Sequence, residues 1–297
     1  MHVVVGGASG FLGSALVAHL RQGGHQVTRL VRHEARKGDE SCWDPARGRI
    51  DQVVIDRADA VVNLSGATIA RWPRTKSYRN TLRQSRLDAT ATLAKAVRHA
   101  ERPPVLLSGS AMGYYGQDRG TEMLDEHASK GDGFLADLVR DWEAAATPAQ
   151  EAGARVAFLR TSLVLHRDGG LLGPLLPLFK TGGGARLGSG RQHMSLMSRV
   201  DWVRSVAHLL EHDVVGPVNL VGPDPVTNAA FTDALGDALG RPTFLVAPSP
   251  VLKVALGSLS GDLLGSVQMT PGVLESTGFT FEHPTLRQQL ESALQDA

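Results

Sequence analysis

The sequence predicts an α/β protein in which a doubly wound parallel sheet is followed by a smaller α+β region. Three observations predict this fold. A glycine turn at residues 7–13 directly follows the apolar run at residues 3–5. Short apolar runs then alternate with helical periodicities over the first half of the chain, which is typical of a parallel sheet covered on both faces. From Leu171 onward, glycines and prolines interrupt this alternation.

The first predicted strand, residues 3–6, leads through the glycine turn into the first predicted helix. Glycines at such a junction turn the chain tightly, let the backbone approach a pyrophosphate and let the helix pack on its strand. The N-terminus of the helix offers free N–H groups and a partial positive charge to phosphates. An ordinary tight turn is the alternative. The junction predicts a dinucleotide site at Gly7, Ser9, Gly10, Phe11, Leu12 and Gly13.

The second predicted strand, residues 26–31, ends in a way that indicates which dinucleotide binds. An NAD site usually places an acid about 20 residues beyond the glycines, where it binds the ribose hydroxyls. Here Arg32 follows the strand and begins a basic segment that includes Arg36 and Lys37. A guanidinium matches a 2′-phosphate, whereas a carboxylate would repel it. We therefore expect NADP, with Arg32 as the leading phosphate ligand; solvated surface charges are the alternative.

The remaining elements continue the alternation. We expect further strands at residues 58–64, 105–108 and 155–159, helices at 76–101 and 134–151, and a short hairpin within 41–50. We place a dinucleotide-binding domain at residues 1–166 and a smaller C-terminal substrate or lid region at 167–297, with a helix near 199–212 returning to the first domain. The length of 297 residues is sufficient for a large core.

Small and hydroxylated residues end the later strands. Ligands of an open doubly wound sheet lie beyond the carboxyl ends of its strands. We therefore expect Ser65, Gly66 and Ser108 to line the nucleotide slot, and Trp72 and Arg74 are candidates for covering it. Gly and Ser also end strands for conformational reasons, which is the alternative for any one of them.

Charge and cysteine content restrict the partners and the compartment. The net charge of +1 gives no reason to expect a nucleic acid or an anionic membrane as a partner. The single cysteine, Cys42, has no internal disulfide partner and fits a reducing compartment. No leader pattern or spanning segment is visible, and no histidine has a zinc-site spacing. We expect a cytoplasmic monomer or homodimer with a small-molecule substrate and no metal.

Several short motifs together resemble one family. They are GASGFLG at residues 7–13, NLSG at 63–66, SR at 85–86, SGSAMGYYG at 108–116, DWEAA at 141–145, LGSGRQ at 187–192 and the closing segment 271–290. Nearly the whole chain resembles the extended short-chain dehydrogenase/reductases, in particular their atypical epimerase-like branch with a C-terminal region of unknown function. The resemblance implies a Rossmann fold and NADP, with Arg32, Leu64, Ser65 and Arg86 near the cofactor.

The usual catalytic pair of that family is missing from this chain. The family's mechanism uses a tyrosine, a lysine four residues later and a serine or threonine at an earlier strand end; Ser110 matches the serine. Leu135 and Val139, or with a one-residue slip Phe134 and Leu138, stand where the pair belongs. None of these four residues carries a phenol or an ammonium group. Any proton donor must therefore be another residue.

We expect Ser110 and Tyr115 to be the catalytic residues if the chain is an enzyme. Tyr114 and the loop carboxylates Glu122, Asp125 and Glu126 are further candidates for the proton donor. A free phenol has a pKa of about 10 and needs a nearby cation to act at neutral pH. A tyrosine packed at a strand end with its hydroxyl satisfied is the structural alternative.

Two classes of function follow. The first is an NADP-dependent oxidoreductase, or an epimerase-like enzyme that oxidises and re-reduces a small carbonyl or hydroxyl compound. The second is a non-catalytic NADP(H)-binding regulatory or structural protein, which the missing pair favours. Ser110 and a complete set of cofactor residues favour the enzyme. The balanced charge argues against an RNA-binding relative.

Overall fold

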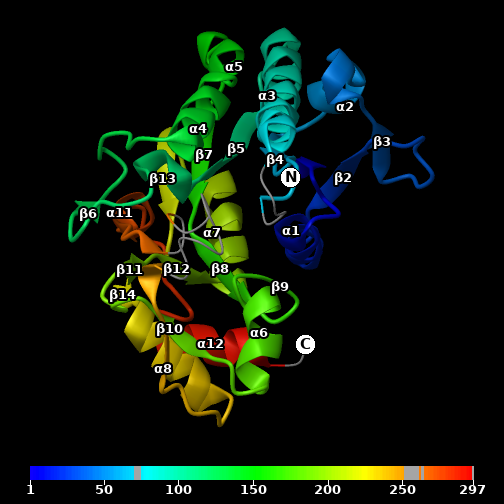
Figure 1. Cartoon of the computed structure of the whole chain (residues 1–297). Coiled ribbons are helices and arrows are strands. Elements are labelled where there is room, and N and C mark those ends of the chain that lie inside the picture. Colours follow the sequence, from blue (N-terminus) through cyan, green and yellow to red (C-terminus); the bar gives the residue numbers. More distant parts are fainter. Residues whose placement is uncertain (70–74, 251–260, 262–263, 296–297) are drawn as a thin grey trace. The chain divides into compact units, whose positions relative to one another are not determined.

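The computed structural model in Figure 1 describes residues 1–69, 75–250, 261 and 264–295. Trp72 and Arg74 lie outside the described residues. The chain forms two compact units that interleave along the sequence. The first unit comprises Met1–Ser110, Leu138–Leu159 and Val206–Pro217, and the second comprises Ala111–Asp137, Arg160–Ser205 and Val218–Ala297. The chain therefore passes between the two units several times; the sequence analysis expected a boundary after residue 166 and a helix near 199–212 that returns to the first domain.

A seven-stranded sheet provides the frame of the first unit, with the strand order β13-β7-β5-β4-β1-β2-β3. Its strands are β1 (His2–Gly6), β2 (Gln26–Val31), β3 (Glu40–Cys42), β4 (Ala60–Asn63), β5 (Val105–Ala111), β7 (Val156–Thr161) and β13 (Gly216–Leu220). The pairings of β1 with β2 and β4, of β2 with β3 and of β4 with β5 are parallel. The α/β prediction with a large parallel sheet is confirmed. The strand order reverses between β1 and β4, and ligands of such sheets bind at this reversal.

The helices of the alternating part are α1 (Phe11–Gln22), α2 (Gln52–Asp56), α3 (Lys76–His99), α4 (Phe134–Ala144), α5 (Thr147–Glu151) and α7 (Arg199–Glu211). The single helix expected at 134–151 is wrong, because α4 ends at Ala144 and α5 restarts with Pro148 in its first turn. Proline lacks an N–H group and its ring clashes with the carbonyl four residues earlier, which here belongs to Ala144. The C-terminal half of α7 belongs to the first unit.

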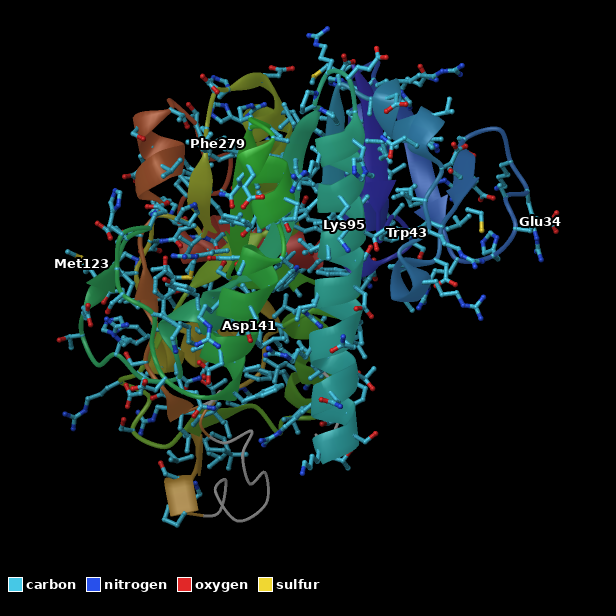
Figure 2. All side chains as sticks on the ribbon, turned by 90° about the horizontal axis from the view of Figure 1, so that it is seen from above. Glu34, Trp43, Lys95, Met123, Asp141 and Phe279 are labelled. Atoms are coloured by element: carbon cyan, nitrogen blue, oxygen red, sulfur yellow. The ribbon has the colours of Figure 1, made fainter. Side chains whose placement is uncertain are left out.

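The segment after β2 differs in detail from the expected hairpin. β3 pairs with β2 in parallel, and a 3-10 turn at Pro45–Arg47 follows it. An isolated antiparallel bridge between Asp44 and Arg49 is the hairpin-like part of this segment. The loop between β2 and β3 extends outward, with Glu34 at its outer end (Figure 2).

The core of the first unit lies between the sheet and α3. Val4 of β1, Val61 of β4 and Leu106 of β5 are fully buried and share one cluster with Leu93 and Val97 of α3. Each fully buried aliphatic side chain contributes about 1.5–3 kcal/mol relative to an exposed one. The opposite face of α3 is in solvent, where the exposed Lys95 marks it in Figure 2. This packing fixes the carboxyl ends of β1, β4 and β5 relative to one another.

The second unit is built from small sheets and helices. Its strands are β6 (Met123–Leu124), β8 (Leu163–His166), β9 (Gly169–Gly170), β10 (Ala185–Leu187), β11 (His193–Met194), β12 (Leu196–Ser198), β14 (Val226–Thr227), β15 (Leu245–Ala247) and β16 (Gln268–Met269). Its helices include α6 (Leu172–Lys180), α8 (Asn228–Ala238), α11 (Gly272–Ser276) and α12 (Leu286–Leu294). Leu165, Leu172, Leu196, Phe231 and Leu290 form its core. In the described part of the chain, no helix combines the length and apolarity needed to cross a membrane.

Candidate functional site

Two glycines of the turn between β1 and α1 are required by the packing of the chain itself. Gly7 has a φ of +77°, and a Cβ there would lie 2.6 Å from the carbonyl carbon and oxygen of Leu64. A Cβ on Gly13 would lie 2.2 Å from the carbonyl oxygen of Gly7. A side chain at Gly13 would push α1 away from the turn, and a side chain at Gly7 would push the turn away from the end of β4. Gly7 and Gly13 are therefore architectural.

Gly10 differs from Gly7 and Gly13, because the fold leaves more room for a Cβ at this position than at the other two. It is exposed, and a Cβ there would meet only the carbonyl oxygen of Gly7, at 3.3 Å. Gly10 is the N-cap of α1, with extended φ and ψ, no side-chain cap hydrogen bond and no acid in the first turn. Ser9 beside it is exposed, and Phe11 and Leu12 are half-buried. The positive end of α1 thus lies at the surface, where an anion can approach the backbone closely.

The turn after β4 lies against the end of β1 and contains a buried hydroxyl. Asn63 Oδ1 accepts a hydrogen bond from the Ser65 amide at 3.1 Å, and the Leu64 amide donates to the Gly6 carbonyl at 2.9 Å. Ser65 Oγ is buried and has no hydrogen-bond partner among the residues that the structure describes. A buried polar group left unpaired costs about 1–3 kcal/mol. Ser65 therefore fits a polar ligand at this turn.

Arg86 of α3 supports the same turn with a half-buried cation. Its Nη1 donates to the carbonyls of Ala67 and Leu82, both at 3.1 Å. A Cβ on Gly66 would lie 3.1 Å from Arg86 Cζ, so glycine lets the guanidinium approach the turn. Burial lowers the pKa of Arg86. No carboxylate is paired with Arg86 in the described part of the chain, and a partly buried cation without a counter-charge suits an anionic ligand.

The basic residues around the end of β2 have different environments. Arg29 is held by Asp39, with Nε 3.0 Å from Oδ2, and by Glu40, with Nη2 2.8 Å from Oε1. The hydrogen bond from Arg29 is the main cause that lowers the pKa of Asp39 to about 2. Arg32 is exposed directly after β2 and forms no ion pair within residues 1–69 or the other described ranges. Arg32 therefore has the free guanidinium that a 2′-phosphate requires.

The end of β5 holds a contact that the sequence analysis missed. Ser110 Oγ donates a hydrogen bond to Glu143 Oε1 of α4 at 2.6 Å, and both residues belong to the first unit. Ser108, two residues earlier, is fully buried. Glu143 lies four residues, one helical turn, beyond Val139, so the two share a helix face. The sequence contains one signal for this contact: Glu143 lies one helical turn from Val139, which stands where the family places its lysine.

Tyr115 lies in the second unit, within a cluster of Tyr114, Tyr115, Glu126, Arg160 and Asn219 that we call the tyrosine cluster. Its hydroxyl lies 2.7 Å from Asn219 Oδ1 and 3.0 Å from the Asp125 carbonyl, and accepts a hydrogen bond from Arg160 Nη1 at 3.1 Å. Burial raises the pKa of Tyr115. These contacts are typical of a packed tyrosine with a satisfied hydroxyl. A catalytic role for Tyr115 stays a prediction.

The other proton-donor candidates also have structural partners. The Arg160 guanidinium lies 3.5 Å from the ring centroid of Tyr114. Glu126 Oε1 accepts hydrogen bonds from the backbone amides of Asn219 and Val273. Glu122 forms a surface ion pair with Arg119 at 2.8 Å.

The strand order of the sheet reverses beside the glycine turn. These two features together define a nucleotide-binding α/β protein of the Rossmann type. The sequence profile of the NAD dependent epimerase/dehydratase family matches residues 3–222, and that of a domain of unknown function, DUF1731, matches residues 247–297. The chain belongs to the NAD dependent epimerase/dehydratase family. The expected family is confirmed.

Relatives of the full chain agree with this assignment. Epimerase family protein MT2273 of Mycobacterium tuberculosis is 44% identical over 290 residues, which cover 97% of this chain and 96% of the relative. Human epimerase family protein SDR39U1 is 38% identical over 258 residues, 82% of each chain.

Solved structures show the same similarity. The crystal structure of human SDR39U1 isoform 2 with NADPH matches with a TM-score of 0.88 at 34% identity and covers 99% of both chains. A UDP-glucose 4-epimerase from Thermotoga maritima, solved with UDP-glucose, matches with a TM-score of 0.77 at 17% identity, covering 99% of this chain and 97% of the other. The second likeness concerns the fold alone.

Proposed function

We propose that the chain binds NADP(H) at the carboxyl ends of β1, β2 and β4 and is an oxidoreductase or epimerase-like enzyme acting on a small carbonyl or hydroxyl compound. The exposed backbone at Gly10, the N-cap of α1, carries this proposal. The packing of the chain explains the glycines at positions 7 and 13, but it places no constraint of that kind on position 10. A pyrophosphate lying against the backbone would require glycine there.

The surrounding groups fit the rest of an NADP molecule. Arg32 would pair with the 2′-phosphate, since it is exposed at the end of β2 and has no acidic partner among the described residues. Ser65 Oγ and the Arg86 guanidinium would supply polar and cationic contacts at the β4 turn. The nicotinamide, when bound, supplies the hydride chemistry of such enzymes. The NADPH bound by the human relative supports this choice of cofactor.

A non-catalytic NADP(H)-binding protein is the second candidate. It is favoured by the apolar residues at the family's usual catalytic positions: Leu135 is half-buried and Val139 is buried in α4. Such a protein would retain the cofactor site and lack turnover. We also propose a cytoplasmic location, since the exposed Cys42 is a free thiol. A small-molecule substrate and a monomeric or homodimeric state are further parts of the proposal.

Loss of NADPH absorbance during incubation with a panel of aldehydes, ketones and quinones separates the two candidates. The enzyme proposal predicts protein-dependent NADPH consumption with at least one carbonyl compound. Binding of NADPH without consumption by any compound would favour the non-catalytic protein. Absence of binding would contradict both.

A further inference from the structure

We infer that Ser110 and Glu143 form the proton-transfer pair of this enzyme, in which Ser110 contacts the substrate oxygen and Glu143 acts through Ser110. The inference rests on the proposed function, since it assigns the acid–base step that accompanies hydride transfer. It answers the question raised by the missing tyrosine and lysine. The two residues are 33 positions apart in the sequence, and the fold brings them into contact.

The geometry of the contact suits proton transfer. Ser110 Oγ and Glu143 Oε1 are 2.6 Å apart, within the range of about 2.5–2.7 Å for hydrogen bonds between a hydroxyl and a carboxylate. Ser110 donates its only hydroxyl proton to Glu143, so its lone pairs are available to accept a proton from a substrate hydroxyl. Ser110 is buried and Glu143 is half-buried, so the carboxyl can exchange its proton with solvent.

A dedicated packing arrangement holds α4 close enough to β5 for this contact. Trp142 Nε1 donates to Thr90 Oγ1 at 2.9 Å, and Asn63 Nδ2 donates to the same oxygen at 2.9 Å. A Cβ on Gly109 would lie 2.9 Å from Trp142 Cζ2, so only glycine lets the indole lie against β5. The neighbour of Trp142 on α4 is Glu143. The network that positions the carboxylate therefore includes Asn63, which also holds the β4 turn.

The protons and electrons of the proposed transfer balance for alcohol oxidation and for carbonyl reduction. When an alcohol is oxidised, Ser110 Oγ takes the substrate O–H proton while its own proton passes to the Glu143 carboxylate. The electron pair of the substrate C–H bond leaves as hydride, which the oxidised nicotinamide accepts when bound. The substrate becomes a carbonyl compound, and Glu143 becomes a carboxylic acid. Carbonyl reduction is the reverse, with protonated Glu143 supplying the proton through Ser110.

Other groups near the expected catalytic positions are already engaged. The nearest lysine in the sequence, Lys130, donates to the Gly131 carbonyl at 2.7 Å and to Asp137 Oδ1 at 3.0 Å. The Tyr115 hydroxyl lies within the tyrosine cluster of the second unit. The alternative role of the contact between Ser110 and Glu143 is structural: it would only hold β5 and α4 together. The test must separate that role from proton transfer.

Glu143→Gln makes this separation, because the glutamine oxygen still accepts the Ser110 hydrogen bond but no longer takes up the proton. The measurement is NADPH consumption with 9,10-phenanthrenequinone across a pH series, with kcat and KM determined separately. We expect kcat to fall about 100-fold or more, the usual contribution of general acid–base catalysis. KM and NADPH affinity should stay within about twofold of wild type, since neither binding contact is removed.

The pH profile and companion variants add readouts that a purely structural role would not affect. Glu143→Gln should change the pH profile of the reduction rate, because the variant removes the group that exchanges the proton. Ser110→Ala should match the loss in kcat without adding to it in the double variant, because the two residues act as one unit. Glu143→Asp should recover part of the rate. Glu151→Gln, on a surface carboxylate of α5 paired with Arg98, is the matched control and should behave as wild type.

An infrared measurement on the cofactor-free protein gives a readout without turnover. The carboxylate stretch that Glu143→Gln removes should shift in Ser110→Ala, since the hydrogen bond is lost. A wild-type rate and pH profile in Glu143→Gln would overturn the pair and leave the proposed enzyme intact. A wild-type protein that binds NADPH but consumes it with no carbonyl compound would overturn both the enzyme and the pair.

Discussion

The glycine turn region of the first unit comprises residues 7–13 together with Arg32, Ser65 and Arg86. It contains polar groups similar to those of the tyrosine cluster in the second unit, but the two regions differ in the hydrogen-bond and ion-pair partners that these groups have. In the first region, Ser65 Oγ is buried without a partner, and neither Arg32 nor Arg86 has a carboxylate partner among the described residues. In the second, the Tyr115 hydroxyl has three polar neighbours, and Glu126 Oε1 accepts two backbone amides.

The difference indicates which region binds a ligand. Buried polar groups in folded proteins are nearly always hydrogen-bonded, so an unpaired one requires an explanation. In the tyrosine cluster the fold supplies every partner named above, so these contacts need no ligand to explain them. Among the described residues, the glycine turn region has a hydroxyl without a hydrogen-bond partner, two guanidinium groups without a carboxylate partner and a helix N-terminus without a side-chain cap. A dinucleotide carries phosphates and hydroxyls that would do so.

The largest effect is expected from Gly10→Val. The variant should fold, because its Cβ would meet only the Gly7 oxygen and the φ of −76° suits any residue. It should lose at least about 100-fold, or about 2.8 kcal/mol, in affinity for NADPH and NADH alike, because the side chain blocks the pyrophosphate. Calorimetric titration with circular dichroism checks both points. Gly13→Val is the contrasting control and should lose stability instead, and a folded Gly10→Val that binds normally would remove the site.

Arg32→Ala should have a smaller and more selective effect. A hydrogen bond to a charged group contributes about 1.5–3 kcal/mol, so NADPH affinity should fall about 10- to 100-fold. NADH affinity should change little, because NADH lacks the 2′-phosphate. Parallel titrations with the two cofactors measure the ratio, and Arg36→Ala on the same exposed loop is the control. Equal losses for both cofactors would show that Arg32 does not bind the phosphate.

Tyr115→Phe tests whether the hydroxyl in the tyrosine cluster stabilises the fold. Removing the hydroxyl should lower the free energy of unfolding by about 1–2 kcal/mol, because buried partners lose their hydrogen bonds. Burial raises the pKa of Tyr115, so this group stabilises the fold below the unfolded pKa of about 10 and that contribution declines as pH rises further. The stability difference between wild type and variant should therefore shrink above about pH 10, as urea unfolding would show. Loss of turnover at unchanged stability would instead make Tyr115 catalytic.

Ser65→Ala should change the free energy of unfolding least, and it should leave that free energy unchanged or raise it, whereas Tyr115→Phe lowers it. The variant removes a buried hydroxyl that has no partner among the residues described, so the cofactor-free protein should be equally stable or gain up to about 1 kcal/mol. NADPH should bind several-fold more weakly, by about 0.5–1 kcal/mol, if the hydroxyl contacts the cofactor. Thermal unfolding with and without NADPH measures both quantities. Destabilisation like that of Tyr115→Phe would show that Ser65 has a structural partner.

Local patterns were sufficient to predict the sheet and the cofactor end of the site. The junction of β1, the glycine turn and α1 depends on neighbouring residues, and β2 has the predicted bounds of 26–31. β4 ends at Asn63, just before the expected turn at Ser65, but the expected end at Ser108 is wrong, because β5 continues to Ala111. The restart of the chain at α5 was not predicted, although Pro148 was a local signal against one continuous helix at 134–151.

Features that depend on distant contacts were not predictable. Arg29 and Arg32 look alike in the sequence, and only the pairing of β2 with β3 brings Asp39 and Glu40 to Arg29. The division into two interleaved units arises from packing between remote segments. The contact of Ser110 with Glu143 arises in the same way, since it joins the end of β5 to α4.

The proposed dinucleotide site can be tested by calorimetric titration of the cofactor-stripped protein with NADPH and, in parallel, with NADH. We expect one NADPH per chain, bound at least about tenfold more tightly than NADH, a difference of about 1.4 kcal/mol. Binding of neither cofactor would contradict the claim that the unpaired groups of the glycine turn region form a dinucleotide site. Equal affinity for both would contradict the role of Arg32 in selecting NADP.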